Sequence, residues 1–97
     1  MIDFEAARKI VADSFQVREC YPADDFMVGD YGWEDVNRFR VVAGTRRDVT
    51  GVGGFESLTL DPPIVFVEKA SGAVQLWYGS RLERPLAGMT PIGVAPA

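Results

Sequence analysis

The stretch from Asp61 to Val74, DPPIVFVEKASGAV, decides the expected fold. Its two prolines lack amide protons and therefore end the preceding loop. Residues 64–68 follow as a run of mostly β-branched and aromatic side chains, which is typical of a strand inside a sheet rather than at its edge. The turn KASG places Gly72 where a hairpin with a glycine bulge requires a left-handed backbone. The stretch thus predicts a hairpin whose return strand covers residues 73–78.

The N-terminal part of the chain has the apolar spacing of a helix. Apolar residues recur every three or four positions from Phe4 to Phe15, which predicts an amphipathic helix over about residues 4–17. Asp3 is suited to the N-cap, and Glu5 falls in the first turn, where the helix dipole favours an anion. A helix of this length can cover several strands of a small sheet.

The period changes between the helix and the hairpin. Residues 26–31 alternate weakly, and RFRVVAG at residues 38–44 alternates strongly, which predicts two antiparallel strands joined by a polar loop. In the second strand we expect Phe39 and Val41 to face the core and Val42 to face outward. The sequence therefore predicts an α+β fold: one N-terminal amphipathic helix packed on an antiparallel sheet of about four strands, in the order helix-strand-strand-strand-strand.

The length of 97 residues is that of a single domain, residues 1–97. The glycine-rich segment at about residues 48–60 has no sustained period and predicts a long loop, of a kind that is often mobile or used in binding. The tail at about residues 90–97 ends in small residues and prolines, which predicts fraying.

Composition excludes several kinds of chemistry. The chain has no histidine and one cysteine, Cys20, which rules out zinc sites built from these residues and an intrachain disulfide. The run GVGG at residues 51–54 lacks the context of a phosphate-binding loop. A formal net charge of −4 argues against a nucleic-acid partner. The sequence has no apolar run of membrane-spanning length and starts without a signal-peptide pattern, so we expect a cytoplasmic protein with no cofactor and no membrane partner.

Acidic and aromatic residues are concentrated between residues 24 and 35. Three interpretations are open: carboxylates that serve hydrolysis or hold magnesium or calcium, a solvated acidic face, or a protein-binding surface. Tyrosine and tryptophan beside charges are typical of interface hot spots, which favours the last. The pattern has no EF-hand spacing, so we name no catalytic, cofactor-binding or metal-binding residue. The candidate partner-binding residues are Asp24, Asp25, Asp30, Tyr31, Trp33, Glu34 and Asp35.

The order of these features resembles a known family. A helix with EAARKIV, a strand pair containing YGWEDVNRFRVVAG, the hairpin DPPIVFVEKASGAVQL and the ending LAGMTPIG are similar to the YrhB-type domain, a group of small bacterial proteins that includes immunity protein 35 relatives. The resemblance covers nearly the whole chain. It implies a single α+β domain and, in many relatives, a role as the immunity partner of a bacterial toxin.

We therefore expect a non-enzymatic immunity protein that acts as a toxin inhibitor, or antitoxin, by stoichiometric binding to a cognate toxin domain. A basic toxin would complement the acidic chain. Two alternatives stay open: a general chaperone-like holdase, and a structural homodimer that uses an edge strand.

Overall fold

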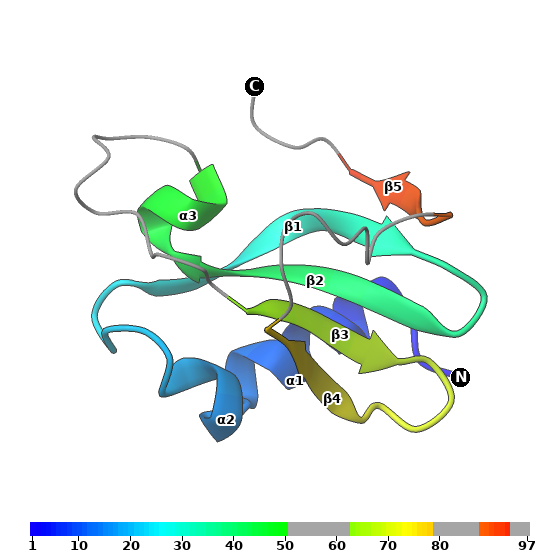
Figure 1. Cartoon of the computed structure of the whole chain (residues 1–97), viewed down its shortest axis with the longest axis horizontal. Coiled ribbons are helices and arrows are strands. Elements are labelled where there is room, and N and C mark those ends of the chain that lie inside the picture. Colours follow the sequence, from blue (N-terminus) through cyan, green and yellow to red (C-terminus); the bar gives the residue numbers. More distant parts are fainter. Residues whose placement is uncertain (51–62, 79–87, 94–97) are drawn as a thin grey trace.

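A computed structural model describes residues 1–50, 63–78 and 88–93 of the chain, and these residues confirm the α+β fold (Figure 1). They form a five-stranded antiparallel sheet in the order β4-β3-β2-β1-β5, with α1 packed on it. One more strand is present than the sequence predicts. The elements are α1 (Phe4–Asp13), α2 (Phe15–Arg18), β1 (Phe26–Glu34), β2 (Arg38–Thr45), α3 (Arg46–Thr50), β3 (Ile64–Glu68), β4 (Val74–Trp77) and β5 (Thr90–Ile92).

The single helix expected over residues 4–17 is two helices that meet at Ser14. Ser14 has extended backbone angles, and its hydroxyl accepts a hydrogen bond from the Val17 amide at 3.3 Å, so it caps α2. Asp3 caps α1 as predicted, because its carboxylate accepts a hydrogen bond from the Ala6 amide at 2.8 Å. A serine can end one helix and start the next because its hydroxyl forms hydrogen bonds with nearby backbone groups in place of the helical ones.

β1 is longer than the sequence predicts, because it continues through Gly32 to Glu34. A Cβ atom at Gly32 would clash with the carbonyl oxygen of Arg40, so glycine permits this close strand pairing. The turn follows at Asp35, whose carboxylate accepts hydrogen bonds from the amides of Asn37 at 2.8 Å and Arg38 at 2.7 Å. The polar loop expected after residue 31 is therefore shorter and begins at Asp35.

The hairpin predicted from the opening stretch is present as β3 and β4. Gly72 has the left-handed φ of 76° that its turn requires, and β3 lies between β2 and β4, inside the sheet. The expected frayed tail begins in an ordered strand instead: β5 pairs with Gly32–Glu34 of β1. The first three residues of the expected loop, 48–50, lie in α3 instead. The rest of that loop and residues 94–97 of the expected tail lie outside the described part of the chain.

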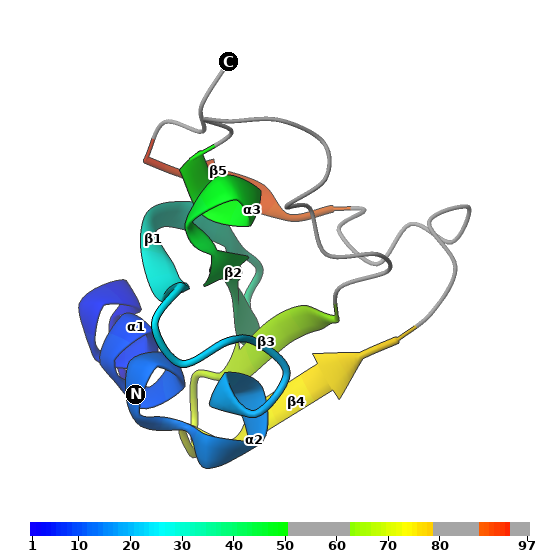
Figure 2. The same cartoon turned by 90° about the vertical axis from the view of Figure 1, so that its left-hand side faces the viewer.

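The sheet has two different faces. Its larger core lies under α1 and α2, which Figure 2 shows together on one side of the sheet. The opposite face holds a smaller cluster in which Tyr31 and Val42 pack on Val49 of α3. Val42 is therefore buried at 8% exposure, and the prediction that it faces solvent is wrong. The buried residues of the larger core are Ala7, Val11, Val17, Tyr21, Phe39, Val41, Val65 and Val67.

No helix in the three described ranges is both long enough and apolar enough to cross a lipid bilayer.

Candidate functional site

The predicted partner-binding residues do not form one patch. Asp24 and Asp25 precede β1, whereas Glu34 and Asp35 lie at and beyond its last residue. A strand of this length spans roughly 25 Å when extended. The two pairs of acids therefore sit at opposite ends of the strand, and only one of these pairs can lie in the centre of a small interface.

At the first end of β1, Asp25 has a structural role. Its carboxylate accepts a hydrogen bond from the Arg46 amide at 3.1 Å, and its carbonyl oxygen accepts from the same amide at 3.1 Å. Asp25 thus fixes the start of α3 to the start of β1. Asp24 is exposed and remains available to a partner.

In the middle of β1, neighbouring residues point to different environments. The side chain of Asp30 is exposed, but Tyr31 is only 8% exposed, and its hydroxyl donates a hydrogen bond to the Val49 carbonyl at 2.7 Å. Burial raises the pKa of Tyr31, the charge of Arg40 opposes this effect, and Asp30 adds to it. Because the ring is enclosed, Tyr31 supports the fold and is not presented to a partner.

Trp33 is half-buried on the face of the sheet opposite α1. Its ring meets Tyr31 edge-on, with centroids 6.5 Å apart, and the guanidinium of Arg40 lies 4.9 Å from its ring centroid. The structure brings these two candidate partner-binding side chains into contact. Trp33 in turn packs against the guanidinium of Arg40.

At the far end of β1, both acids are engaged within the chain. Glu34 forms an ion pair with Lys69 at 2.9 Å, and Asp35 lies 3.8 Å from the guanidinium of Arg38. The pKa of Asp35 is lowered overall. Burial alone would raise it, but hydrogen bonds from the amides of Asn37 and Arg38 and the charges of Arg38 and Lys69 outweigh that effect. Substituting either acid would disturb the fold as well as any interface.

A second candidate surface lies at β4, the outer strand of the sheet. Three large side chains are exposed there and on α2: Phe15 at 78%, Tyr78 at 69% and Trp77 at 36%. The Tyr78 hydroxyl lies 4.0 Å from the thiol of Cys20, which places Tyr78 beside the end of α2. We call Phe15, Trp77 and Tyr78 the aromatic edge. Figure 2 shows α2 next to β4 at this edge.

The aromatic edge does not follow from the sequence pattern. Phe15 continues the apolar stripe of the expected helix, so its spacing assigns it to the core. The break at Ser14 changes its direction, and the ring is exposed instead. The available signal was the serine itself, since a mid-helix serine can act as an N-cap. For Tyr78, the only signal was its position at the end of the last strand of the predicted hairpin.

Neither candidate surface has the arrangement of a metal centre: within residues 1–50, 63–78 and 88–93, no group of three or more cysteine or carboxylate side chains converges. Comparisons with family models, curated proteins and solved structures find no match to this chain.

Proposed function

We propose that this chain is an immunity protein that neutralises a cognate bacterial toxin by stoichiometric protein binding. The single observation that carries the proposal is the aromatic edge, where large apolar side chains are exposed beside the outer strand of the sheet. Large exposed apolar side chains gathered in one region of a small domain favour an interaction surface. Tyrosine and tryptophan supply much of the binding energy when a partner covers them.

The outer strand adds a second means of contact. Figure 1 places β4 at the lower border of the sheet, with β3 on its inner side. An edge strand offers backbone groups to an incoming strand, and neighbouring side chains then give specificity. In this proposal Phe15 and Tyr78 bind one side of the partner segment and Trp77 the other, since successive side chains of a strand point to opposite faces.

Charge supports a basic partner. The chain carries a net charge of −4, and exposed acids such as Asp24 and Asp30 favour approach of a positively charged protein. Toxins that attack nucleic acids need basic surfaces to hold phosphates. The sequence resemblance to immunity proteins supports the same class of partner.

The open edge also favours one other function, a structural homodimer in which two β4 strands pair. Light scattering on the purified chain distinguishes the two: an immunity protein is monomeric until its toxin is added, whereas the homodimer has twice the monomer mass at micromolar concentration. Loss of that dimer in Trp77→Asp would assign it to β4.

The decisive experiment is protection of a bacterial host that expresses the toxin domain encoded beside this chain. We expect Phe15→Ser combined with Tyr78→Ser to weaken binding to that domain roughly tenfold or more, measured by calorimetry, because two anchors are removed. Val36→Ser is the matched control, since Val36 is 81% exposed in the turn after β1. Unchanged protection and unchanged affinity in the double variant would refute the proposal.

The exposed acids give a smaller, graded test. Asp24→Lys and Asp30→Lys should each slow association with a basic toxin several-fold at low salt, with little effect at high salt, because they steer encounter. Glu34 and Asp35 are unsuitable for this test, since both hold the fold together.

A further inference from the structure

The outer edge of β1 is covered over only part of its length. β5 pairs with β1 at Gly32–Glu34 and ends at Ile92. Gly93 then has a left-handed φ of 72°, and a Cβ there would lie 2.9 Å from the Asp30 carbonyl oxygen. Gly93, the last described residue, therefore packs closely against the backbone of Asp30. No described strand pairs with the outer edge of the first half of β1.

A cleft of about 560 Å³ lies between this half of β1 and the polar face of α1. Helix and strand run close together here, as Figure 2 shows and their packing contacts confirm. A groove between a helix and an unpaired edge strand can accept an extended peptide, which adds a strand to the sheet. The lining residues are Glu5, Arg8, Lys9, Ala12, Asp13, Arg18, Phe26, Met27 and Val28.

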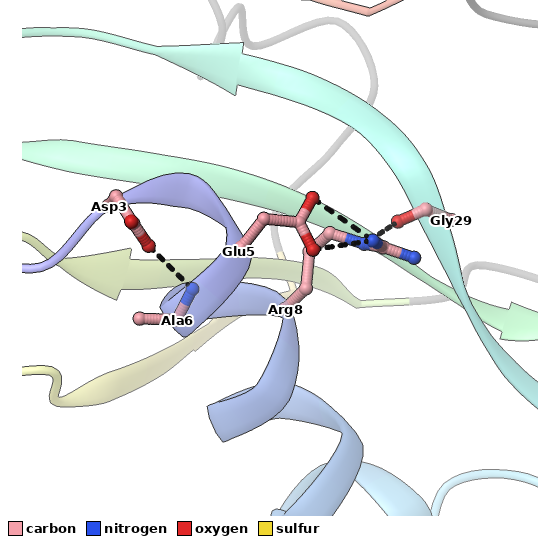
Figure 3. Close-up of polar contacts among 5 residues, drawn as sticks. All are labelled: Asp3, Glu5, Ala6, Arg8 and Gly29. Atoms are coloured by element: carbon pink, nitrogen blue, oxygen red, sulfur yellow. Dashed lines mark hydrogen bonds and ion pairs between the residues drawn. The ribbon is translucent and has the colours of Figure 1, made fainter.

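Arg8 lines the cleft and bridges α1 to β1 (Figure 3). Its Nε atom donates a hydrogen bond to the Gly29 carbonyl at 2.7 Å, and its Nη1 atom donates to the Glu5 carboxylate at 2.9 Å. The charge of Arg8 is thus neutralised by Glu5, and the Gly29 carbonyl is already bonded. A bound strand would therefore lie beside Phe26–Val28 and stop at Arg8.

The remaining charges of the cleft are mainly positive. Lys9 and Arg18 are exposed, and neither forms an ion pair with a residue in the described ranges. Arg18 lies 5.9 Å from the centroid of the Phe26 ring, which directs its guanidinium over the cleft. Asp13 is the one lining acid besides Glu5. This cationic site is unusual on a chain whose net charge is −4.

We propose that this cleft binds an acidic, extended segment of a partner protein. The segment pairs with β1 beside Phe26–Val28, and its carboxylates contact Lys9 and Arg18. Charge complementarity selects the occupant, since a basic segment would meet Lys9 and Arg18, which outnumber Asp13 in the part of the cleft beyond the Arg8–Glu5 pair. The site does not depend on the proposed toxin binding, because its lining residues differ from those of the aromatic edge, although Arg18 shares α2 with Phe15.

The probe is an acetylated and amidated heptapeptide of alternating glutamate and valine, labelled with fluorescein. We expect saturable binding by fluorescence anisotropy, with chemical-shift changes in ¹⁵N spectra at the amides of Phe26 to Val28. The same peptide with lysine in place of glutamate should not bind. A version N-methylated at alternate residues should lose binding at least tenfold, because it cannot form the strand hydrogen bonds.

Substitutions test the charges. Lys9→Gln and Arg18→Gln should each weaken binding of the glutamate peptide about three- to fivefold, as expected for partly exposed ion pairs. Asp13→Asn should tighten it by a similar factor. Gln75→Glu is the matched control, since it makes the same change in net charge on β4 and should leave affinity unchanged apart from a weak salt-dependent effect.

The proposal is overturned by any of three results: equal binding of the lysine peptide, equal effects of Gln75→Glu and Lys9→Gln, or shift changes that map away from β1. Self-association of the chain that protects the cleft would also overturn it, because the occupant would then be a second copy. None of these results bears on toxin binding by the aromatic edge.

Discussion

The two faces of the sheet are built by different means. Under α1, the contacts are mainly aliphatic, and Val41, Val65 and Val67 are each at most 1% exposed. On the opposite face, Arg40 lies over Trp33 and Arg38 over Phe66, the latter at 4.0 Å. Phe39 of the α1 core has a similar cation beside it, because the Lys69 ammonium lies 4.7 Å from its ring centroid. The two faces therefore differ in the extent of their packing: α1 and α2 cover a large core on one face, whereas α3 covers only a small cluster on the other.

On the opposite face, one aromatic side chain, one arginine and a second aromatic side chain lie side by side across three strands. Trp33 of β1 is the pairing partner of Arg40 in β2, and Arg40 is the partner of Phe66 in β3. The guanidinium thus lies in the middle of the sheet between two aromatic residues, where cross-strand neighbours interact. Burial lowers the pKa of Arg40, and its Nε atom has no hydrogen-bond partner among the described residues.

Neighbouring valines in β2 allow the sharpest comparison of the faces. Val41 points to the α1 core at 1% exposure, and Val42 points to the smaller cluster at 8%. We expect Val41→Ala to lower the free energy of unfolding by about 2–3 kcal/mol and Val42→Ala by about 1 kcal/mol, because the larger core leaves a more rigid cavity. Urea unfolding measures both, and each variant controls for the loss of strand propensity in the other.

Equal costs at the two valines would contradict this difference between the faces. The second face would then be as tightly packed as the first.

Arg40 provides the next test, with an effect of opposite sign. Arg40 is half-buried and has no acidic partner among the described residues, so its charge costs desolvation energy. An apolar side chain of similar shape often replaces such a group without loss. We expect Arg40→Met to raise the free energy of unfolding by about 0.5–1 kcal/mol, although it gives up the contact with Trp33. Chemical denaturation followed by tryptophan fluorescence measures the change.

Arg38→Met is the control for Arg40→Met. Arg38 keeps an acidic neighbour, Asp35, at 3.8 Å, so its loss should be neutral or mildly destabilising. A clear destabilisation by Arg40→Met would mean that the guanidinium stabilises this face.

The sequence predicted those parts of the fold that depend on periodicity and on turn residues. The alternation of residues 38–44 gave the strand that became β2, and Gly72 correctly marked the turn between β3 and β4. The long β1 was missed, because Gly32 allows close approach of two strands without bending the chain. Only the position of the neighbouring strand distinguishes these two uses of a glycine.

The candidate surface was less predictable, because a residue's type does not fix its exposure. Tyr31 and Asp30 are adjacent in sequence, yet the tyrosine is enclosed by Val49 of α3, a helix that the sequence analysis did not predict. Phe15 is exposed because the helix breaks one residue earlier. In both cases, an element boundary decides which side chains a partner can reach, and boundaries depend on caps more than on periodicity.

Tyr31 offers the smallest and most selective test of the second face. Its pKa is raised above the ordinary value of 10.0, mainly by burial, although Arg40 partly opposes the shift. The unfolded chain therefore loses this proton first as the pH rises. Its contribution to stability is complete below pH 10 and decreases as the pH rises toward the folded-state pKa.

In urea titrations at pH 8 and above pH 10, Tyr31→Phe should lose less stability on going to the higher pH than the parent chain does. Equal losses would show that the Tyr31 hydroxyl titrates as freely in the folded chain as in the unfolded one, which its 2.7 Å hydrogen bond to Val49 argues against.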